Sequence, residues 1–326
     1  MFIGKVMEIV ISLNETYLMP ATVMLCSLYE NNITELIRVH VLMKEKNEKC
    51  ISILEGITRQ YAQEIRFYDV GDRLPLDLPL GMRCQNDYIT IESYYRLFVA
   101  EILPPTIDKV LYLDCDIIIC KDISDLWRCE VKDVAIAAAP TTYNNSVHVA
   151  NRLGYDVHKG YFNAGVLLIN LKYWRDHQAK QKFMSYIQKN NTQLYSHDQD
   201  VLNYVWQDEK AEIPLKFNLV TSLLFKDKYR EICFLFDGEI RQAFNNPTII
   251  HYTEDKPWYK NCVHPLRRYF EEYKNKTIWK DVPLKRKRIK LKTRLKQLVL
   301  CVIRKEWSYY VSNYEDYYRK HIYVGS

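Results

Sequence analysis

The stretch KVLYLDCD, residues 109–116, decides how the chain folds. A short apolar run typical of a buried strand is followed at once by two acids that flank a cysteine. In an extended chain, side chains two residues apart point the same way, so Asp114 and Asp116 share one side and Cys115 faces the other. Ligands of open α/β sheets bind outside the carboxyl ends of such strands. The stretch therefore predicts both a sheet and a site at its edge.

On both sides of this strand, short apolar runs alternate with stretches of helical periodicity. Pro20 precedes the first helical stretch, where a first turn tolerates proline. The expected elements are strands at residues 7–13, 37–43, 65–70, 109–113, 134–139, 165–171 and 248–252, and helices at residues 22–30, 48–61, 91–103, 174–189 and 198–206. Alternating strands and helices are typical of a mostly parallel sheet flanked by helices, so we predict an α/β fold.

The composition is that of an ordinary globular protein, with 48% hydrophobic and 26% charged residues in a chain of 326. No apolar run approaches the roughly 20 residues that span a bilayer, and Glu8 and Ser12 interrupt the apolar residues 6–13. The nine cysteines include no C-x-x-C pair, which fits neither a disulfide framework nor a zinc site. We expect a cytoplasmic protein with reduced thiols.

The net charge of +6 is concentrated near the C-terminus. Residues 284–305 hold ten lysines and arginines and no acid, which leaves a net charge of −4 on the rest of the chain. Within this segment four leucines and a valine fall at helical spacing on one stripe: Leu284, Leu291, Leu295, Leu298 and Val302. This pattern predicts a basic amphipathic helix on an anionic membrane, and the alternative is a charged helix that packs its leucines on the body of the protein. Because the body is acidic, no nucleic-acid partner is expected.

Two pairs of residues are suited to holding a metal ion and a phosphate. The carboxylates of Asp114 and Asp116 can hold Mg²⁺ or Mn²⁺, which in turn binds a diphosphate, although aspartates at a strand end can also simply cap a turn. His251 follows another apolar strand and is either a third ligand for such an ion or a structural histidine. The ammonium of Lys256 nearby is suited to pairing with phosphate.

Amides and acids gather in two further segments. Asn163 precedes the buried run at residues 165–171, and Asp198, Gln199 and Asp200 open a predicted helix. The acids can serve as a helix cap favoured by the helix dipole. Alternatively, one carboxylate and one amide face a sugar, where they hold its hydroxyls or stabilise a positively charged transition state.

Taken together, these segments resemble glycosyltransferase family 8, which includes bacterial lipopolysaccharide galactosyl- and glucosyltransferases and glycogenin. The resemblance covers roughly the first 280 residues. It rests on an ordered set of segments, which is more specific than any one member: residues 8–17, 95–97, 113–116, 162–165, 198–200, 217–218, 251–252 and 256–258.

The resemblance implies a retaining transferase of the GT-A fold that uses a UDP-sugar and Mn²⁺ or Mg²⁺. By position, the metal ligands would be Asp114, Asp116 and His251. Lys256 would hold the diphosphate, with the metal assisting departure of the leaving group as a Lewis acid. The remaining residues of the implied site are Tyr17 against the uracil, Asn14 and Cys115 beside the nucleotide, and Arg96, Asn163, Asp198 and Gln199 along the donor sugar, with Gln199 as the candidate for stabilising the reacting face.

The chain departs from the family pattern in two places. The first loop carries Asn14 where the family often has an acid that contacts uridine, and asparagine can still donate and accept hydrogen bonds. The usual H-x-x-G-x-x-K-P-W element is one residue shorter here and lacks its glycine, which bears on whether Lys256 reaches the diphosphate.

The sequence thus predicts a catalytic domain at residues 1–281 and a membrane-associating, helical C-terminal extension at residues 282–326. We expect transfer of a hexose, glucose or galactose, from a UDP-sugar to a saccharide or lipid-linked saccharide acceptor in lipopolysaccharide or other cell-surface polysaccharide synthesis, at the inner face of the plasma membrane. Two alternatives stay open: a nucleotide-sugar hydrolase, and a non-catalytic sugar-nucleotide-binding module docked at the membrane.

Overall fold

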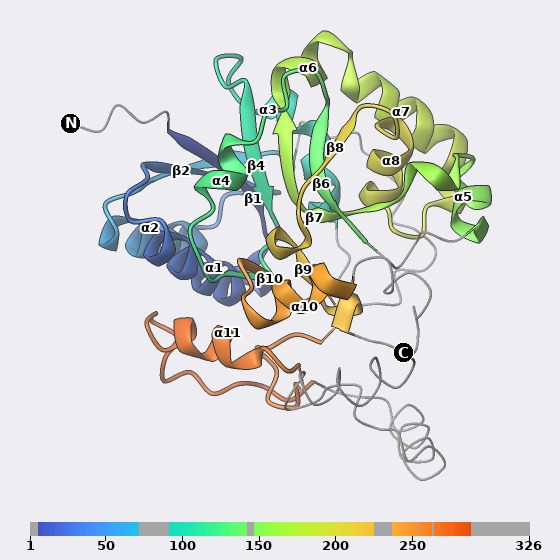
Figure 1. Cartoon of the computed structure of the whole chain (residues 1–326). Helices are drawn as coiled ribbons and strands as arrows, with labels where there is room; N and C mark the ends of the chain where they lie inside the picture. Colours follow the sequence, from blue (N-terminus) through green and yellow to red (C-terminus); the bar gives the residue numbers. More distant parts are fainter. Residues whose placement is uncertain are drawn as a thin grey trace, which may run out of the picture.

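The centre of the protein is a seven-stranded sheet (Figure 1). The computed structural model describes residues 6–71, 91–141, 147–224, 237–253, 255–262 and 264–287. In spatial order the strands are β3 (Glu64–Asp69), β2 (Ile37–Met43), β1 (Met7–Ser12), β4 (Lys109–Leu113), β7 (Phe162–Asn170), β6 (Ile136–Pro140) and β8 (Lys210–Glu212). Only β7 runs antiparallel to its neighbours, so the predicted mostly parallel α/β sheet is confirmed.

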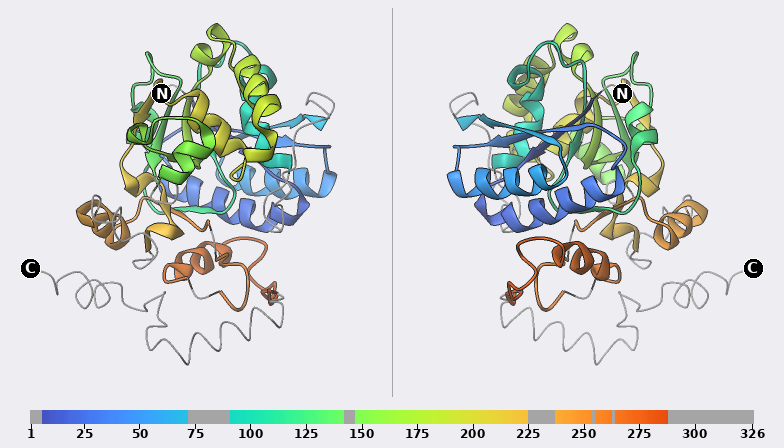
Figure 2. Two further views of the ribbon diagram at one scale, coloured as in Figure 1. Left: turned by 90° about the vertical axis from the view of Figure 1, so that its right-hand side faces the viewer. Right: turned by 90° about the vertical axis from the view of Figure 1, so that its left-hand side faces the viewer.

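Helices cover both faces of the sheet, as both views in Figure 2 show. One face carries α1 (Leu18–Asn31) and α2 (Glu48–Gln60), and α11 (Arg267–Lys274) packs against α1. The opposite face carries η3 (Ile91–Phe98), α3 (Val99–Ile102), α6 (Leu171–Asp176), α7 (Ala179–Asn190) and α8 (Asp198–Val205).

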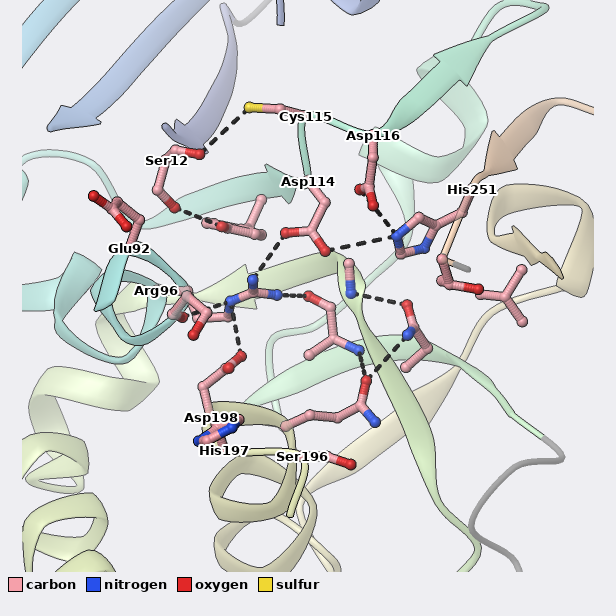
Figure 3. Close-up of a pocket in the computed structure, with 18 of the residues that line it drawn as sticks. Ser12, Glu92, Arg96, Asp114, Cys115, Asp116, Ser196, His197, Asp198 and His251 are labelled. Atoms are coloured by element: carbon pink, nitrogen blue, oxygen red, sulfur yellow. Dashed lines mark hydrogen bonds and ion pairs between the residues drawn. The ribbon is translucent and has the colours of Figure 1, made fainter. Parts of the chain in front are cut away.

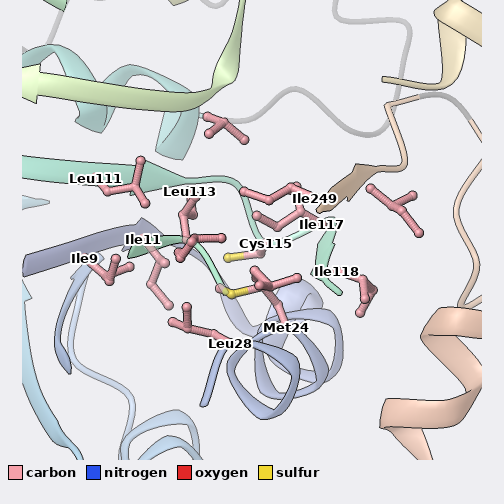
Figure 4. Packing of buried hydrophobic residues seen from close by; sticks show 14 of the residues in the cluster. Ile9, Ile11, Met24, Leu28, Leu111, Leu113, Cys115, Ile117, Ile118 and Ile249 are labelled. Atoms are coloured by element: carbon pink, nitrogen blue, oxygen red, sulfur yellow. The ribbon is translucent and has the colours of Figure 1, made fainter. Parts of the chain in front are cut away.

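The central strands are apolar on both faces because both faces are covered. Along β1, Ile9 and Ile11 point toward α1, whereas Val10 between them points toward the layer that contains η3. Figure 4 shows Ile9 and Ile11 above α1, next to Leu111 and Leu113 of β4. Fully burying one such side chain contributes roughly 1.5–3 kcal/mol, so these two layers hold the strands that lead to the predicted site.

A second, three-stranded sheet was not predicted. It consists of β5 (Ile117–Ile119), β10 (Ile249–His251) and β9 (Leu219–Val220), with β10 in the middle. Because β10 pairs antiparallel with β5, His251 lies opposite Ile117, directly after the predicted Asp-Cys-Asp stretch. The small sheet therefore joins two segments that are far apart in the sequence.

One predicted helix is wrong in its extent. The expected helix at residues 174–189 is two helices, α6 and α7, separated at Gln178, which adopts a φ of 52°. Such a left-handed residue ends a helix, and helical periodicity on both sides of it does not reveal the break. The remaining elements are η1 (Glu15–Tyr17), α4 (Ser124–Arg128), α5 (Val147–Leu153), η4 (Val157–Lys159), η5 (Asn191–Gln193), η6 (Leu215–Phe217), η7 (Thr221–Leu224) and α10 (Asp237–Asn245).

The described part of the chain ends shortly after the predicted domain boundary. A bridge between Tyr259 and Lys285 attaches this last part to the body. Most of the predicted basic helix and the aromatic residues after it, at 288–326, lie outside the described residues, so the membrane extension stays a prediction. No helix within the described ranges is long and apolar enough to cross a membrane.

Candidate functional site

The strand register explains why the predicted site residues converge. Asp114 follows β4, and the parallel neighbour β1 ends beside it at Ser12. Because β7 is antiparallel and pairs Val166 with Leu113, the residues that begin β7, from Asn163 to Gly165, lie beyond the carboxyl end of β4. The backbone N–H of Asp114 donates to the Gly165 carbonyl at 2.8 Å.

All eleven predicted site residues line one cavity of about 520 Å³ (Figure 3). They come from the first loop, η3, the ends of β4 and β7, the start of α8 and the segment after β10. The set is Asn14, Tyr17, Arg96, Asp114, Cys115, Asp116, Asn163, Asp198, Gln199, His251 and Lys256. The structure thus brings them together, while the role of each stays a prediction.

The three predicted metal ligands form one cluster. One ligand atom each from Asp114, Asp116 and His251 lies within 4.8 Å of the others. The Nε2 atom of His251 is 3.2 Å from Asp116 Oδ1 and 3.7 Å from Asp114 Oδ2. Among the described residues this is the only group of three or more histidines, cysteines or acids close enough to share an ion.

The surroundings of the cluster fit a cation. His251 Nδ1 lies 2.9 Å from Asn218 Oδ1, and because an amide oxygen only accepts, we assign the ring proton to Nδ1. The lone pair of Nε2 then points at two carboxylates, an arrangement that a cation between them stabilises. Gly165 leaves space between these ligands, because a Cβ at this position would lie 2.1 Å from His251 Cε1 and 2.7 Å from Asp114 Oδ2.

Lys256 reaches the cluster despite the shortened spacing from His251. Its Nζ atom pairs with Asp116 Oδ2 and donates to the Tyr252 carbonyl at 2.6 Å. Burial by itself would raise the pKa of Asp116, but the ammonium of Lys256, together with His251 when its ring is protonated, outweighs burial and holds that pKa well below its usual range. The side chain of Lys256 is buried and adds a fixed positive charge beside the metal cluster.

Arg96 links the cluster to α8. Its guanidinium lies 2.8 Å from Asp114 Oδ1 and 2.9 Å from Asp198 Oδ2, and it packs over the ring of Tyr112. Burial raises the pKa of the Asp198 carboxyl to about 6, with Arg96 opposing the shift and Asp114 adding to it. Carboxylates held by one buried arginine keep fixed positions, which suits the recognition of sugar hydroxyls.

The amides of the site are oriented by one another. Gln199 Oε1 accepts from Asn163 Nδ2 at 3.0 Å and from the backbone N–H of Ala164 at 2.9 Å. Asn163 Oδ1 in turn accepts from Asn218 Nδ2 at 2.9 Å, which extends the network to His251. The Gln199 amide therefore has a set orientation beside the cavity.

The two acids of α8 differ in their surroundings. Asp200 is fully buried, pairs with Arg152 at 2.8 Å and accepts from the backbone N–H groups of Tyr195 and Ser196. It holds the turn before the helix and does not cap the N–H groups of α8 itself. Asp198 lines the cavity instead, and its predicted contact with a sugar stays a prediction.

The part of the cavity that is predicted to bind the nucleotide contains one ring contact and two local hydrogen bonds. Tyr17 lies edge-on against Trp258, with ring centroids 5.6 Å apart. Asn14 caps η1 by accepting from the Thr16 N–H at 3.0 Å, and Cys115 Sγ donates to the Ser12 carbonyl at 3.4 Å. Of these, Asn14, Tyr17 and Cys115 line the cavity near the end of β1.

Sequence reasoning missed several residues of the site. The role of Asn218 as the hydrogen-bond partner of His251 depends on β9 and β10 lying side by side, which no local pattern reveals. Glu92 and Tyr195 also line the cavity, but they belong to no motif. The sequence holds no signal that singles out either residue.

The mostly parallel sheet and the three side chains at its carboxyl edge that could hold a metal ion together fit a glycosyltransferase of the GT-A class. The protein-family model "Glycosyl transferase family 8" matches residues 8–262, so the chain belongs to glycosyltransferase family 8. The predicted family, fold and enzyme class are confirmed.

Similar proteins include bacterial enzymes. General stress protein A of Bacillus subtilis is 26% identical over 286 residues, covering 85% of this chain and 96% of the relative. A lipopolysaccharide 1,2-glucosyltransferase of Escherichia coli is 27% identical over 281 residues, covering 84% and 79%. The galactosyltransferase LgtC, solved in complex with donor and acceptor sugar analogues, superposes with a TM-score of 0.70 at 25% identity, covering 89% of this chain and 100% of LgtC.

Proposed function

We propose that this enzyme transfers a hexose, glucose or galactose, from a UDP-sugar to a saccharide acceptor in lipopolysaccharide or other cell-surface polysaccharide synthesis. The proposal rests on one observation. Lys256 lies on one side of the cluster formed by the three predicted metal ligands, and the Arg96–Asp198 pair lies on the other side. A diphosphate fits beside the ammonium of Lys256, and a sugar with several hydroxyls fits beside the carboxylate of Asp198, which Arg96 holds in place. The names of the E. coli relative and of LgtC support this substrate class.

Asp114, Asp116 and His251 would hold Mn²⁺ or Mg²⁺. When bound, such an ion neutralises the diphosphate and acts as a Lewis acid on the leaving group. Two carboxylate oxygens with one imidazole nitrogen suit Mn²⁺ better than Mg²⁺, because nitrogen ligands are favoured by transition metals.

The chain's own residues would then bind and orient the donor. The ammonium of Lys256 pairs with diphosphate oxygens, and Tyr17 packs against the uracil, with Asn14 and Cys115 beside it. On the sugar side, Arg96 and Asp198 hold hydroxyls through charge-assisted hydrogen bonds.

The amides complete the sugar side of the proposed site. Asn163 and Gln199 form a polar wall beside the reacting carbon, where the amide oxygen of Gln199 can stabilise developing positive charge. For retention of configuration, the acceptor has to approach from the same face of the sugar that the diphosphate leaves.

The test is release of UDP from a panel of nucleotide hexoses by purified protein with Mn²⁺, with Mg²⁺ or with chelator, with and without saccharide acceptors. We expect one UDP-hexose to turn over only with metal. Asp116→Asn should lower turnover by about 100-fold or more, the magnitude typical of removing one preorganised charge-stabilising group. Asp125→Asn is the matched control, because the Asp125 side chain is 83% exposed and remote from the cavity.

The products separate transfer from hydrolysis. Attachment of the hexose to an added saccharide supports the proposed transferase, whereas release of free hexose with every acceptor tested would favour a nucleotide-sugar hydrolase. Metal-independent turnover, or full activity of Asp116→Asn, would contradict the proposed site.

We further propose that residues 282–326 attach the enzyme to an anionic membrane surface at the inner face of the plasma membrane. The support is the charge pattern: ten lysines and arginines without an acid within residues 284–305, followed by Trp307 and five tyrosines before residue 319. Attachment would bring the site to a lipid-linked or lipopolysaccharide acceptor.

A further inference from the structure

Glu92 is an acid of the cavity wall that no motif predicts. It belongs to η3, lines the cavity and is partly buried. Its Oε2 atom is buried and accepts no hydrogen bond from any of the residues that the structure describes. Leaving a buried carboxylate oxygen without a donor costs about 1–3 kcal/mol or more, so such an atom beside a ligand cavity calls for a donor from the ligand.

Arg96, the arginine of the same element, is already engaged. Arg96 lies four residues further along η3, but its guanidinium pairs with Asp114 and Asp198 and donates to the Ala164 carbonyl. Figure 3 shows Glu92 on the side of Arg96 that faces away from Asp116 and His251. Glu92 therefore stands at the end of the site opposite the cation cluster.

This position decides which part of a donor reaches Glu92. In the function proposed above, the diphosphate lies at the cation cluster and Lys256, so the anomeric carbon of the hexose lies next to them. The opposite edge of the hexose, with its hydroxyls at C3, C4 and C6, then extends past Arg96. A carboxylate only accepts hydrogen bonds, and a sugar hydroxyl can supply the donor that Glu92 Oε2 lacks.

We propose that Glu92 selects the donor hexose by accepting a hydrogen bond from a hydroxyl on the edge remote from the anomeric carbon. The inference rests on the proposed function and adds a residue that recognises the sugar part of the donor. Glucose and galactose differ only in the orientation of the C4 hydroxyl, so Glu92 discriminates between them if the hydroxyl that it bonds is the one at C4. A site built to bond a hydroxyl rejects an analogue that lacks it, because its polar group is then left unpaired.

The test uses the full chain with Mn²⁺ and compares the wild type with Glu92→Ala and Glu92→Gln. Calorimetry measures the affinity for UDP, for the preferred UDP-hexose, and for its 3-deoxy, 4-deoxy and 6-deoxy analogues. Glu92→Ala should weaken binding of the parent hexose donor by about 10-fold to 100-fold, the range for a charge-assisted hydrogen bond. Glu92→Gln keeps a neutral hydrogen-bond acceptor, so its affinity for the parent donor should lie between those of the wild type and Glu92→Ala. The affinity for UDP should be the same in all three proteins.

The deoxy analogues distinguish recognition from a structural role. One of them, lacking the hydroxyl that Glu92 bonds, should bind wild type and Glu92→Ala equally weakly, while the other two still show the loss. An equal loss with UDP and with all sugars, or no loss at all, overturns the inference and leaves the proposed function standing. If UDP binds the wild type but no UDP-hexose binds or turns over, the proposed function fails and this inference fails with it.

Discussion

Gly165 has the most restricted position in the site, since a side chain there would occupy the space between His251 and Asp114. Gly165→Ala should push these two ligands apart, because the new Cβ would lie 2.1 Å from His251 Cε1. We expect metal affinity to fall by about 10-fold to 100-fold or more, with a matching loss of turnover. Titration with Mn²⁺ measures the affinity.

Gly56→Ala is the matched control for this substitution. Gly56 lies inside α2, and a Cβ added there meets nothing within 4 Å. Alanine in a helix interior is more stable than glycine by roughly 0.5–1 kcal/mol, so this variant should bind metal normally and unfold at a slightly higher temperature. Unchanged Mn²⁺ binding by Gly165→Ala would show that the cluster tolerates displacement.

His264 gives the fold a pH dependence. Burial, with a smaller contribution from Lys256, lowers the pKa of His264 to about 3, and its Nδ1 atom accepts from the Leu266 N–H at 3.2 Å. The unfolded chain binds a proton here near pH 6.5, whereas the folded chain does not. This stability is therefore present above pH 6.5 and is lost as the pH falls, by up to about 1.4 kcal/mol per pH unit for one proton.

The measurement is the thermal unfolding midpoint between pH 7.5 and pH 5, in the presence of chelator. His264→Asn keeps a side-chain acceptor but does not titrate in this range, so its midpoint should fall less than that of the wild type on acidification. Parallel curves for the two proteins would mean that His264 contributes nothing to acid sensitivity.

At the scale of single residues, the sequence reveals charged groups better than their partners. Asp114 and Asp116 follow a recognisable buried strand, and the alternation of an extended chain alone places them on one side. The proton position on His251 could not be predicted, because it depends on Asn218, a residue that approaches only through the small sheet. The lack of a hydrogen-bond donor for Glu92 Oε2 likewise cannot be predicted, because it depends on the positions of all neighbouring residues that the structure describes.

At the scale of elements, the start of α8 carries strain. His197 adopts a φ of 48° and ψ of −116°, is buried, and lies against Tyr94 of η3, with 3.3 Å between His197 Nδ1 and the Tyr94 hydroxyl. A side chain in such a region costs about 1–3 kcal/mol and persists only where the surroundings enforce it. This turn sets the direction of Asp198, the next residue.

Substitutions at His197 should therefore follow backbone preference more than size. Glycine adopts this conformation freely, alanine retains the strain, and valine is sterically the worst. We expect affinity for the UDP-hexose to decrease in the order His197→Gly, His197→Ala, His197→Val, while affinity for UDP without a sugar changes little. If alanine binds the sugar nucleotide better than glycine does, packing against Tyr94 matters more than the turn.

Most elements could be predicted because they carry strong local periodicity, as in β2 and β4, whose observed bounds match the prediction. The direction of β7 could not, since an apolar run looks the same in parallel and antiparallel pairing. The break at Gln178 was hidden for a similar reason: helical spacing continues on both sides of one left-handed residue.

At the scale of the whole molecule, the basic C-terminal segment predicts that the enzyme binds to an anionic membrane surface. In the full chain, changing Lys290, Lys292, Arg294 and Lys296 to Glu should abolish binding to vesicles that contain anionic lipid, because each cation near such a surface contributes about 1 kcal/mol. Transfer to a soluble saccharide acceptor should stay unchanged. Vesicle co-sedimentation and the transfer assay measure the two effects.

The control for this variant carries the same change in charge on the catalytic body, at four exposed lysines: Lys44, Lys46, Lys132 and Lys189. It should still sediment with anionic vesicles. Equal losses in both proteins would indicate that net charge, and no particular segment, drives the association.

The position of β10 has a consequence for how the enzyme is made. β1, β2, β3 and β4 all come from the first 113 residues, whereas His251 arrives much later in the chain and reaches Asp116 only by pairing with β5. Because chains fold from the N-terminus during synthesis, the nascent protein can form much of its sheet before it can hold a metal ion. If the cluster binds a metal as proposed, the nascent chain would acquire it only after translation has passed residue 251, and a prematurely terminated chain, however well folded, would lack the proposed ligand His251.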